Sequence, residues 1–190
     1  MNKIKRNFLI VFAVVCVLAL GVALLFVGSD WYFKAVYPLK YTEIVEQNAA
    51  EFSLPPSLVY GIIHTESHFD SEAVSSAGAK GLMQLMDTTY EWIQQKLPEE
   101  PAPLSRIFEP AVNIRSGCKV MDVLLKQFDN LQTALAAYNA GSGNVSRWLK
   151  NPEYSTDGIT LTVIPITETK NYVERVLNAQ KRYQTLYNID

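Results

Sequence analysis

The sequence predicts an all-α protein that carries one transmembrane helix at its N-terminus. From residue 41 onward, apolar residues recur at helical spacing through most of the chain. Prolines and glycines lie between these periodic segments and separate one helix from the next. Strand-like alternation is confined to residues 159–166, so a sheet is not expected. An uncharged stretch of twenty residues near the N-terminus has the length that spans a bilayer as a helix.

This apolar stretch covers residues 8–27 and is rich in Val, Leu, Phe and Ala. Lys3, Lys5 and Arg6 precede it, and basic residues in that position keep the N-terminus in the cytoplasm. We therefore expect a cytoplasmic tail over residues 1–7, a single-pass signal anchor in the cytoplasmic membrane, and an extracytoplasmic remainder. A cleaved signal peptide is the alternative, but its apolar region usually has only about 7–15 residues and a clear cleavage site.

The rest of the chain divides into a short tether and one domain. Residues 28–40 form the tether, and residues 41–190 are enough for a domain with its own core. Residues 31–190 carry 14 Lys and Arg against 18 Asp and Glu, which argues against nucleic acid as a partner because phosphate binding needs clustered basic residues. Cys16 lies in the anchor, and Cys118 is expected to be a small buried residue, so no disulfide should link them.

Prolines separate the first two helices of the domain. Thr42 can cap the first helix, whose apolar face extends to Phe52. Pro55 and Pro56 break the chain and start the second helix, because proline is tolerated in a first helical turn but not in a helix interior. This second helix is expected to end at about Ser67.

The next two helices lie on either side of a proline-rich segment. A loop of small and polar residues leads to the third helix, which begins at Asp87 or Thr88. Four prolines over residues 97–110 predict an irregular surface excursion. A long helix follows over residues 111–128. Its Gly117 costs about 1 kcal/mol relative to alanine, so we expect this glycine to permit the close approach of another helix.

Three shorter or terminal elements complete the domain. Residues 131–138 form a helix that stops at the glycine-rich segment 139–143, and residues 145–149 form a short helix. The β-branched residues of the segment 159–166 predict either a brief strand or an extended loop. The last helix starts near Thr167 and turns an apolar face toward the interior.

Glu66 is the acidic residue that the helical pattern singles out. Leu58, Ile62 and Glu66 fall at successive i+4 positions and so share the interior-facing side of one helix. Burial disfavours the charged form of a carboxyl group and raises its pKa. A carboxylic acid that stays protonated near neutral pH is the proton donor that cleavage of a glycosidic bond requires. From the spacing alone, a helix-capping or salt-bridged glutamate is an equally good interpretation.

Several motifs that follow Glu66 raise the catalytic interpretation above that alternative. In chain order they are Glu66-Ser67, Ser75 with Gly78–Met86, Asn113-Ile114, Ala136–Gly141, and Glu168-Thr169 with Tyr172-Val173. Together they resemble the Slt-type lytic transglycosylases, glycoside hydrolase family 23, which share the goose-type lysozyme fold. The resemblance covers about residues 41–185. It implies a lysozyme-like domain that cleaves the β-1,4 bond between N-acetylmuramic acid and N-acetylglucosamine in peptidoglycan strands and leaves a 1,6-anhydromuramoyl end.

The resemblance also implies a role for each matched side chain. Glu66 would be the catalytic acid and then the base, and one carboxylate suffices because the attacking hydroxyl belongs to the sugar. Tyr138 would point its hydroxyl toward Glu66 and the substrate. The other substrate-binding positions are Ser75, Gln84, Met86, Glu168 and Tyr172. Without the family, Gln84 would be a surface amide, Met86 a core residue and Glu168 an acid at a helix N-terminus.

The sequence departs from the family at Asp87, where members usually have a proline. Asp87 can cap the following helix, so we expect an effect on loop geometry and none on the chemistry. His64 and His68 have the i, i+4 spacing of a metal-binding pair, but no second pair of ligands appears in the sequence. We therefore expect no metal and no cofactor.

Two other functions compete with a lytic transglycosylase. In a lysozyme-like hydrolase, water would replace the C6 hydroxyl of the sugar, but no aspartate can be assigned as the base that activates water. A non-catalytic glycan-binding scaffold of an envelope complex is the second alternative. The joint presence of Glu66, Gln84 and Tyr138 argues against a scaffold, because a protein without catalysis has no reason to retain the acid.

Overall fold

The computed structural model describes residues 12, 15, 16 and 31–190, and the chain divides into two units, Met1–Pro38 and Leu39–Asp190. In the first unit, residues 31–36 are helical. The anchor predicted from the sequence lies outside the described residues, apart from the three isolated positions. Within the described part of the chain, no helix combines the length and the apolar character that a membrane crossing requires.

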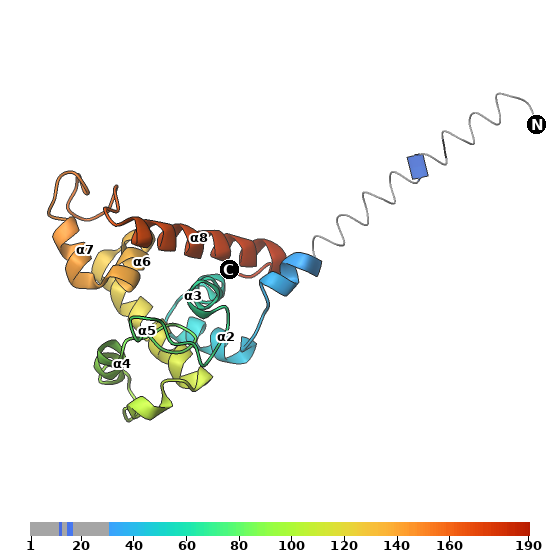
Figure 1. Cartoon of the computed structure of the whole chain (residues 1–190), viewed down its shortest axis with the longest axis horizontal. Helices are drawn as coiled ribbons and strands as arrows, with labels where there is room; N and C mark the ends of the chain where they lie inside the picture. Colours follow the sequence, from blue (N-terminus) through green and yellow to red (C-terminus); the bar gives the residue numbers. More distant parts are fainter. Residues whose placement is uncertain (1–11, 13–14, 17–30) are drawn as a thin grey trace, which may run out of the picture. The chain divides into compact units, whose positions relative to one another are not determined.

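The second unit is built from helices joined by loops, as Figure 1 shows. They are α2 (Thr42–Glu51), α3 (Pro56–Ser67), α4 (Asp87–Gln94), the 3-10 helix η1 (Leu104–Arg106), α5 (Pro110–Phe128), α6 (Leu131–Ala140), α7 (Ser142–Trp148) and α8 (Thr167–Tyr187). Strand-like pairing in the described residues is limited to two isolated bridges, Val74 with Lys80 and Lys80 with Leu85. The all-α prediction is confirmed, and residues 159–166 form a loop rather than a strand.

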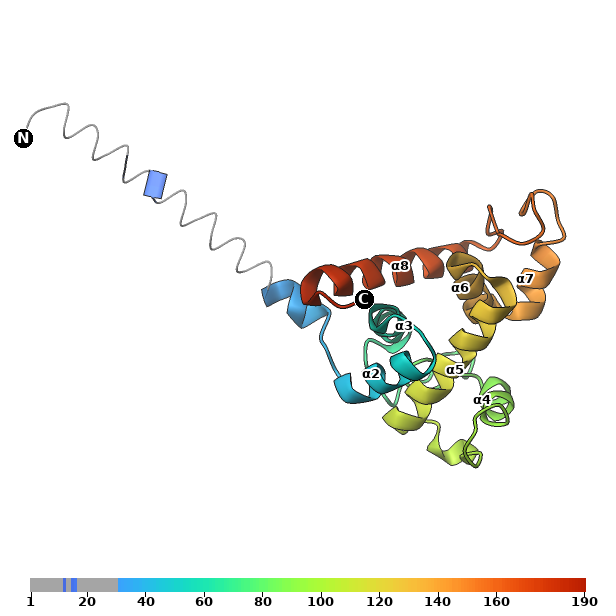
Figure 2. The ribbon, with the colours of Figure 1, turned by 180° about the vertical axis from the view of Figure 1, so that it is seen from behind.

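Helix α3 lies in the core and packs mainly against the long helix α8 (Figures 1 and 2). The side chains of Ile62 and Ile63 are completely buried. Gly61 faces the backbone of α8, and a Cβ atom there would lie 3.0 Å from both the carbonyl oxygen of Val176 and the amide nitrogen of Gln180. The absence of a side chain at Gly61 therefore lets the two helices approach closely.

Helix α5 packs against three helices, α2, α4 and α6, and so links them to one another. A Cβ atom at its Gly117 would lie 2.8 Å from the Cβ and Cε atoms of Met83. The expected close approach at Gly117 is present, but the neighbour is a loop side chain rather than another helix. Cys118 is fully buried, as expected, and burial raises the pKa of its thiol.

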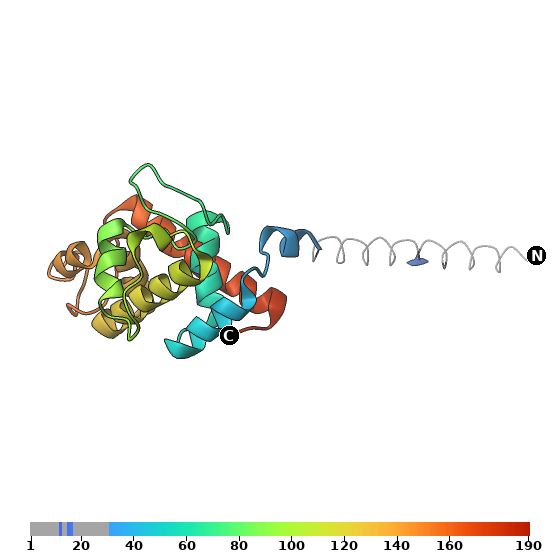
Figure 3. The same cartoon turned by 90° about the horizontal axis from the view of Figure 1, so that it is seen from below.

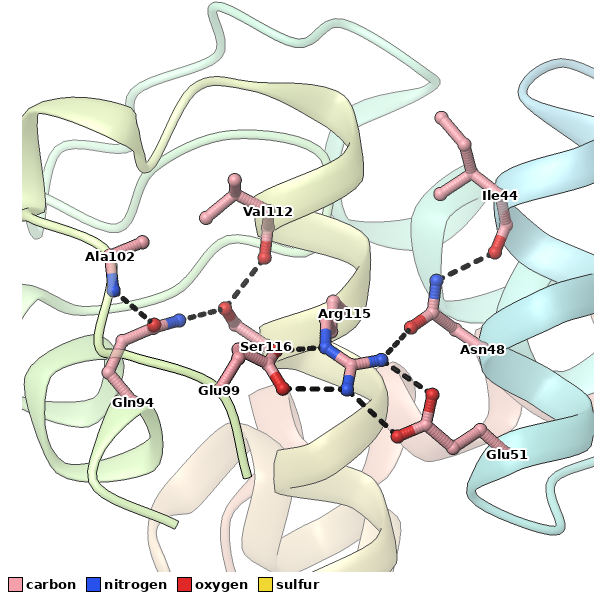
Figure 4. A network of polar contacts seen from close by, with 9 residues as sticks. All are labelled: Ile44, Asn48, Glu51, Gln94, Glu99, Ala102, Val112, Arg115 and Ser116. Carbon is pink, nitrogen blue, oxygen red and sulfur yellow. Dashed lines mark hydrogen bonds and ion pairs between the residues drawn. The ribbon is translucent and has the colours of Figure 1, made fainter. Parts of the chain in front are cut away.

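Arg115 of α5 fastens α2 to the excursion between α4 and α5 (Figure 4). Its guanidinium donates to the carboxylate of Glu51 at 2.6 and 2.8 Å and to the side-chain oxygen of Asn48 at 3.2 Å. It also pairs with Glu99 in the excursion. Hydrogen bonding to Arg115 lowers the pKa of both glutamates, so these acids stay charged and hold the excursion against the helices.

Candidate active site

Glu66 lies in the last turn of α3 and keeps a proton at unusually high pH. Burial raises the pKa of its carboxyl to about 7. The hydroxyl of Tyr172 and the positive charge of Arg175, both on α8, act in the opposite direction and limit the rise. The carboxyl can therefore donate a proton near neutral pH and also accept one back.

The chain turns sharply just beyond this carboxyl. His68 and Phe69 both have positive φ angles, of 50° and 65°, so the helix ends at Ser67 as predicted. The Ser67 hydroxyl donates to the carbonyl oxygen of Leu82 at 2.8 Å. This bond joins the end of α3 to the loop that precedes α4, which Figure 3 shows running out from α3.

Two tyrosines lie close to Glu66, one from α6 and one from α8. Tyr138 donates its hydroxyl proton to the carbonyl oxygen of Met83 at 2.9 Å. Tyr172 is only 2% exposed, and its hydroxyl makes no hydrogen bond of standard geometry with a described residue, although it lies near enough to lower the pKa of Glu66. Burial, and then the charge of Glu66, raise the pKa of both phenols well above the usual value, so both stay protonated.

Asn113 of α5 fixes the loop that precedes α4 through hydrogen bonds to its backbone. It is completely buried, and its side-chain oxygen accepts a hydrogen bond from the backbone of Met83 at 2.8 Å. Its amide nitrogen donates to the carbonyl oxygens of Ile107 at 2.7 Å and Lys80 at 3.2 Å. Gly81 has a φ of 74°, and a Cβ atom there would lie 2.9 Å from Cγ of Asn113. Only glycine combines that φ with that contact.

Gln84 and Ser75 form hydrogen bonds within the loop itself. Gln84 has a φ of 47°, and its amide nitrogen donates to the carbonyl oxygens of Gly81 at 2.9 Å and Ala73 at 3.1 Å. The Ser75 hydroxyl oxygen accepts from the backbone nitrogen of Ala79 at 3.0 Å. These bonds use the amide nitrogen of Gln84 and the hydroxyl oxygen of Ser75. They leave the amide oxygen of Gln84 and the hydroxyl proton of Ser75 available for other partners.

Met86 and Asp87 both differ from the roles that the residues alone suggest. Met86 is 42% exposed and stands at the N-cap of α4, so it is not a core residue. Asp87 does not cap α4, because it occupies the first helical position and its carboxylate pairs with Lys80 at 2.6 and 2.7 Å. The expectation of a capping aspartate is wrong, and the ion pair closes the loop instead.

Glu168 is exposed, unlike Tyr172 on the same helix. It lies in the first turn of α8, and its carboxylate makes no hydrogen bond or ion pair with any described residue. Tyr172, one turn later on the same helix, is buried beside Glu66. The structure thus brings Glu66, Tyr138 and Tyr172 together and leaves Glu168 at the solvent-exposed start of α8.

A groove of about 300 Å³ lies next to Tyr138. Thr88 and Trp92 of α4, Leu124 and Gln127 of α5, and Tyr138 are among the residues that line it. Sequence reasoning treated Trp92 only as part of a helix. A signal was present, because the residues three and four positions away from Trp92, which share its helix face, are all polar. They are Thr88, Thr89, Gln95 and Lys96.

The two histidines near Glu66 pack against each other and against α8. Their ring centroids are 4.8 Å apart, and the ring of His64 meets Tyr183 edge-on with centroids 6.3 Å apart. His68 is exposed, whereas His64 is half-buried. The rings of His64, His68 and Tyr183 thus form an aromatic cluster at the end of α3.

Comparison with known proteins identifies the family of this helical unit. Residues 43–159 match the model of the transglycosylase SLT domain, which is more than half of the chain. The chain belongs to the SLT-domain family. The family expected from the motifs is therefore confirmed.

Two relatives of this SLT-domain protein are lytic murein transglycosylases. It is 30% identical over 162 residues to the soluble lytic murein transglycosylase of Escherichia coli (strain K12), a match that covers 83% of this chain and 25% of that protein. It is also 30% identical over 167 residues to the membrane-bound lytic murein transglycosylase C of Yersinia pestis (strain Pestoides F), which covers 76% and 47%. The SLT-domain chain spans between a quarter and a half of the length of these relatives.

Solved structures match the fold of the SLT domain as well. The lytic transglycosylase Slt from Pseudomonas aeruginosa, solved as an inactive glutamate-to-glutamine mutant, superposes with a TM-score of 0.71 at 35% identity and covers 80% of this chain and 25% of that one. The 70 kDa soluble lytic transglycosylase from Escherichia coli has a TM-score of 0.70 at 28% identity, with 83% and 26% covered. The lysozyme-like Slt fold that the motifs implied is confirmed.

Proposed function

We propose that this chain is a peptidoglycan lytic transglycosylase in which Glu66 is the sole acid and base. The observation that carries the proposal is a half-buried carboxyl, set beside two protonated tyrosines, whose pKa desolvation raises to about 7. Support also comes from the relatives named lytic murein transglycosylases and from the glutamate-to-glutamine mutant of one neighbour that is described as inactive.

In the proposed reaction, Glu66 first gives its proton to the glycosidic oxygen as the bond from that oxygen to C1 of N-acetylmuramic acid breaks. The same group, now a carboxylate, takes the proton from the C6 hydroxyl of that sugar. The C6 oxygen forms the new bond to C1, so the products are a free 4-hydroxyl on one side and a 1,6-anhydro ring on the other. No water is consumed, and the attack within one sugar ring gains the high effective concentration of an intramolecular step.

The neighbours of Glu66 favour this reaction over hydrolysis. Ordinary glycosidases use two carboxylates at a fixed separation. The groups that shift the pKa of Glu66 are a buried environment, Tyr172 and Arg175, and none of these is a second acid. A single carboxylate suits attack by the C6 hydroxyl of the sugar better than attack by an activated water.

The remaining matched residues are proposed to bind the glycan. The free amide oxygen of Gln84 can accept a hydrogen bond from a sugar hydroxyl, and the hydroxyl of Ser75 can donate one. Exposed Met86 can cover the apolar face of a sugar ring at the start of α4. Glu168, which is exposed at the start of α8, can accept from a hydroxyl or an amide, and Tyr172 can donate to the carboxylate of Glu66 when it forms.

We also propose that residues 8–27 anchor the protein in the cytoplasmic membrane as a single pass, with residues 1–7 in the cytoplasm and residues 28–40 tethering the extracytoplasmic domain, residues 41–190. The apolar stretch and the preceding basic residues support this topology. Exposed Trp31 and Tyr32, at 73% and 58%, follow the stretch after three residues and fit the aromatic belt of a membrane interface. One relative is itself named membrane-bound.

Substitution of Glu66 tests the enzymatic proposal. Glu66→Gln should lower the release of muropeptides from purified peptidoglycan by about 10²–10⁴-fold, the usual contribution of a general acid, while binding of the glycan is retained. The exposed residue Glu153 offers a matched control, since Glu153→Gln makes the same carboxyl-to-amide change away from α3. Unchanged turnover in Glu66→Gln would remove the site assignment, and mass spectrometry of the products separates anhydro ends from reducing ends.

A further inference from the structure

Helix α4 presents one large aromatic ring to the groove beside Tyr138. Trp92 is 46% exposed, whereas its neighbours on the other side of the helix, Tyr90 and Ile93, are completely buried. The ring lines the same groove as Tyr138, which in turn lies beside Glu66. A partly exposed indole leaves apolar surface in contact with water, and a ligand that covers this surface gains free energy of binding.

The inner face of α4 is held firmly, so the position of Trp92 is well defined. Gln94 is 3% exposed, and its amide nitrogen donates to Oγ of Ser116 on α5 at 2.8 Å (Figure 4). Its side-chain oxygen accepts from the backbone nitrogen of Ala102 at 2.9 Å. The buried hydroxyl of Tyr90 donates to the carbonyl oxygen of Ala102 at 3.2 Å. These bonds tie α4 to both α5 and the excursion.

A lysine one turn beyond Trp92 restrains the indole itself. The ammonium nitrogen of Lys96 lies 5.0 Å from the centroid of the Trp92 ring. A cation at this distance is attracted by the ring and restricts its rotation. Because Lys96 is exposed and on the same segment as Trp92, it can hold the indole without filling the groove.

We propose that Trp92 is a sugar-stacking residue of the groove and that Lys96 is a positioning residue that holds its indole. The inference rests on the proposed function, because the ligand is a glycan strand whose reacting bond lies at Glu66. A sugar ring has apolar C–H faces that fit a flat indole, and the side chains of Thr88 and Gln127 in the same groove can bond to its hydroxyls.

The position of Trp92 predicts which kinetic constant depends on it. Trp92 stands on the α4 wall of the groove, and Tyr138 stands on the α6 wall next to Glu66. Glu66 itself is not among the residues that line this groove, so in the proposal the sugar that stacks on Trp92 is a different ring from the one that reacts. Loss of the stack weakens binding of long glycans and leaves the chemical step unchanged, so KM rises and kcat does not fall.

A binding measurement tests the stack without requiring turnover. The full chain in detergent carries Glu66→Gln with Trp31→Phe and Trp148→Phe, which leaves Trp92 as the sole tryptophan. Titration with a hexamer of N-acetylglucosamine should change the indole emission with saturation. A matched chain that keeps Trp148 instead of Trp92 should show no such change. Equal responses of the two chains, or no response while calorimetry detects binding, would overturn the proposal.

Kinetics on peptidoglycan strands provide the second arm. Trp92→Ala should raise KM about tenfold, the ratio that corresponds to about 1.4 kcal/mol, with kcat changed less than about twofold. Trp92→Phe, which retains a flat ring, should lie between the parent and Trp92→Ala. Lys96→Met should raise KM by a smaller factor, and Lys96→Arg should restore it because the cation remains over the ring.

The binding and kinetic experiments distinguish failure of the Trp92 stack from failure of the catalytic assignment of Glu66. If Glu66→Gln turns over normally while Trp92 emission responds to the hexamer, the catalytic assignment is wrong and the stack stands. If Glu66→Gln is inactive while Trp92→Ala has an unchanged KM, the stack is wrong and the catalytic assignment stands. Loss of folding does not explain a raised KM if the thermal midpoints of Trp92→Ala and Trp92→Phe both equal that of the parent.

Discussion

At the scale of single residues, burial raises the pKa of Glu66 and the hydroxyl of Tyr172 partly offsets that rise. The hydroxyl makes no hydrogen bond of standard geometry with a described residue, but it acts on Glu66 as a hydrogen-bond donor. The hydroxyl lowers the pKa of Glu66, which means that it stabilises the carboxylate rather than the acid. In the proposed reaction that carboxylate exists between the two proton transfers. Tyr172 would therefore favour the intermediate state of the site.

Tyr172→Phe should move the pH dependence of turnover in a defined direction. Activity requires protonated Glu66, so kcat/KM falls as pH rises through the pKa of about 7. Removing the hydroxyl removes a group that lowers this pKa, so the pKa rises and the alkaline limb shifts to higher pH. The measurement is kcat/KM against pH for parent and variant. An alkaline limb that stays in place or moves to lower pH would contradict the assigned role of Tyr172.

Tyr60 is a matched control for this substitution. It is a buried tyrosine on α3 whose hydroxyl also lacks a hydrogen bond of standard geometry among the described residues, but it does not contribute to the pKa shift of Glu66. Tyr60→Phe should leave the alkaline limb in place. Both variants should keep the free energy of unfolding within about 1 kcal/mol of the parent, because neither removes a well-formed hydrogen bond.

The sequence predicted some of these residue-scale features and missed others. The partial burial of Glu66 could be predicted from its i+4 spacing with apolar residues, because a helical pattern is local. The inward bonds of Gln84 depend on a φ of 47°, and the pairing of Asp87 with Lys80 depends on how the loop closes. Residue spacing encodes neither backbone feature, so a capping role for Asp87 was a reasonable and incorrect expectation. A binding role for Trp92 could not be predicted from the sequence, because the groove that it lines also includes residues of α5 and α6, which are distant from it in the chain.

At the scale of elements, the packing of α3 on α8 positions the carboxyl and its two α8 neighbours. The boundaries of most helices were predicted to within a few residues, because prolines and glycines mark them locally. The contact between α3 and α8 joins segments more than 100 residues apart in the chain, so no local pattern could predict it. Gly61 is the residue that makes this close contact feasible.

Gly61→Ala should destabilise the domain. The new Cβ atom would lie 3.0 Å from backbone atoms of Val176 and Gln180, and overpacking of this kind typically costs about 1–3 kcal/mol. Gly143 in α7 provides the matched control, because a Cβ atom there meets nothing within 4 Å. Gly143→Ala should be neutral or stabilise by up to about 1 kcal/mol. Urea unfolding of the three chains compares them, and equal destabilisation by both substitutions would refute the packing argument.

At the scale of the whole molecule, the proposed anchor over residues 8–27 would hold a lysozyme-like SLT domain close to the membrane surface. The domain matches only a part of its larger relatives, yet it holds the acid, the two tyrosines and the groove within one helical unit. If the anchor is present, the catalytic unit works on the peptidoglycan that lies nearest to the membrane. The exposed aromatic residues at the start of the tether are the feature that makes this topology testable.

The membrane topology predicts a specific response of Trp31. In full-length chains reconstituted into vesicles, a chain with Trp31 as its sole tryptophan should be quenched by lipids brominated near the headgroup, because the indole lies at the interface. A chain with Trp148 as its sole tryptophan should be quenched much less, since Trp148 belongs to the helical domain. Equal quenching of the two chains would argue against an interfacial position for Trp31.

Digestion of peptidoglycan in water labelled with heavy oxygen tests the sole-carboxylate mechanism most directly. If Glu66 hands its proton to the leaving oxygen and the C6 hydroxyl then closes the ring, mass spectrometry will show anhydro ends that carry no heavy oxygen. The Glu66→Gln chain will release such fragments about 10²–10⁴-fold more slowly. Reducing ends that contain the heavy isotope would mean that water attacks, and the enzyme would then be a hydrolase that needs a second base.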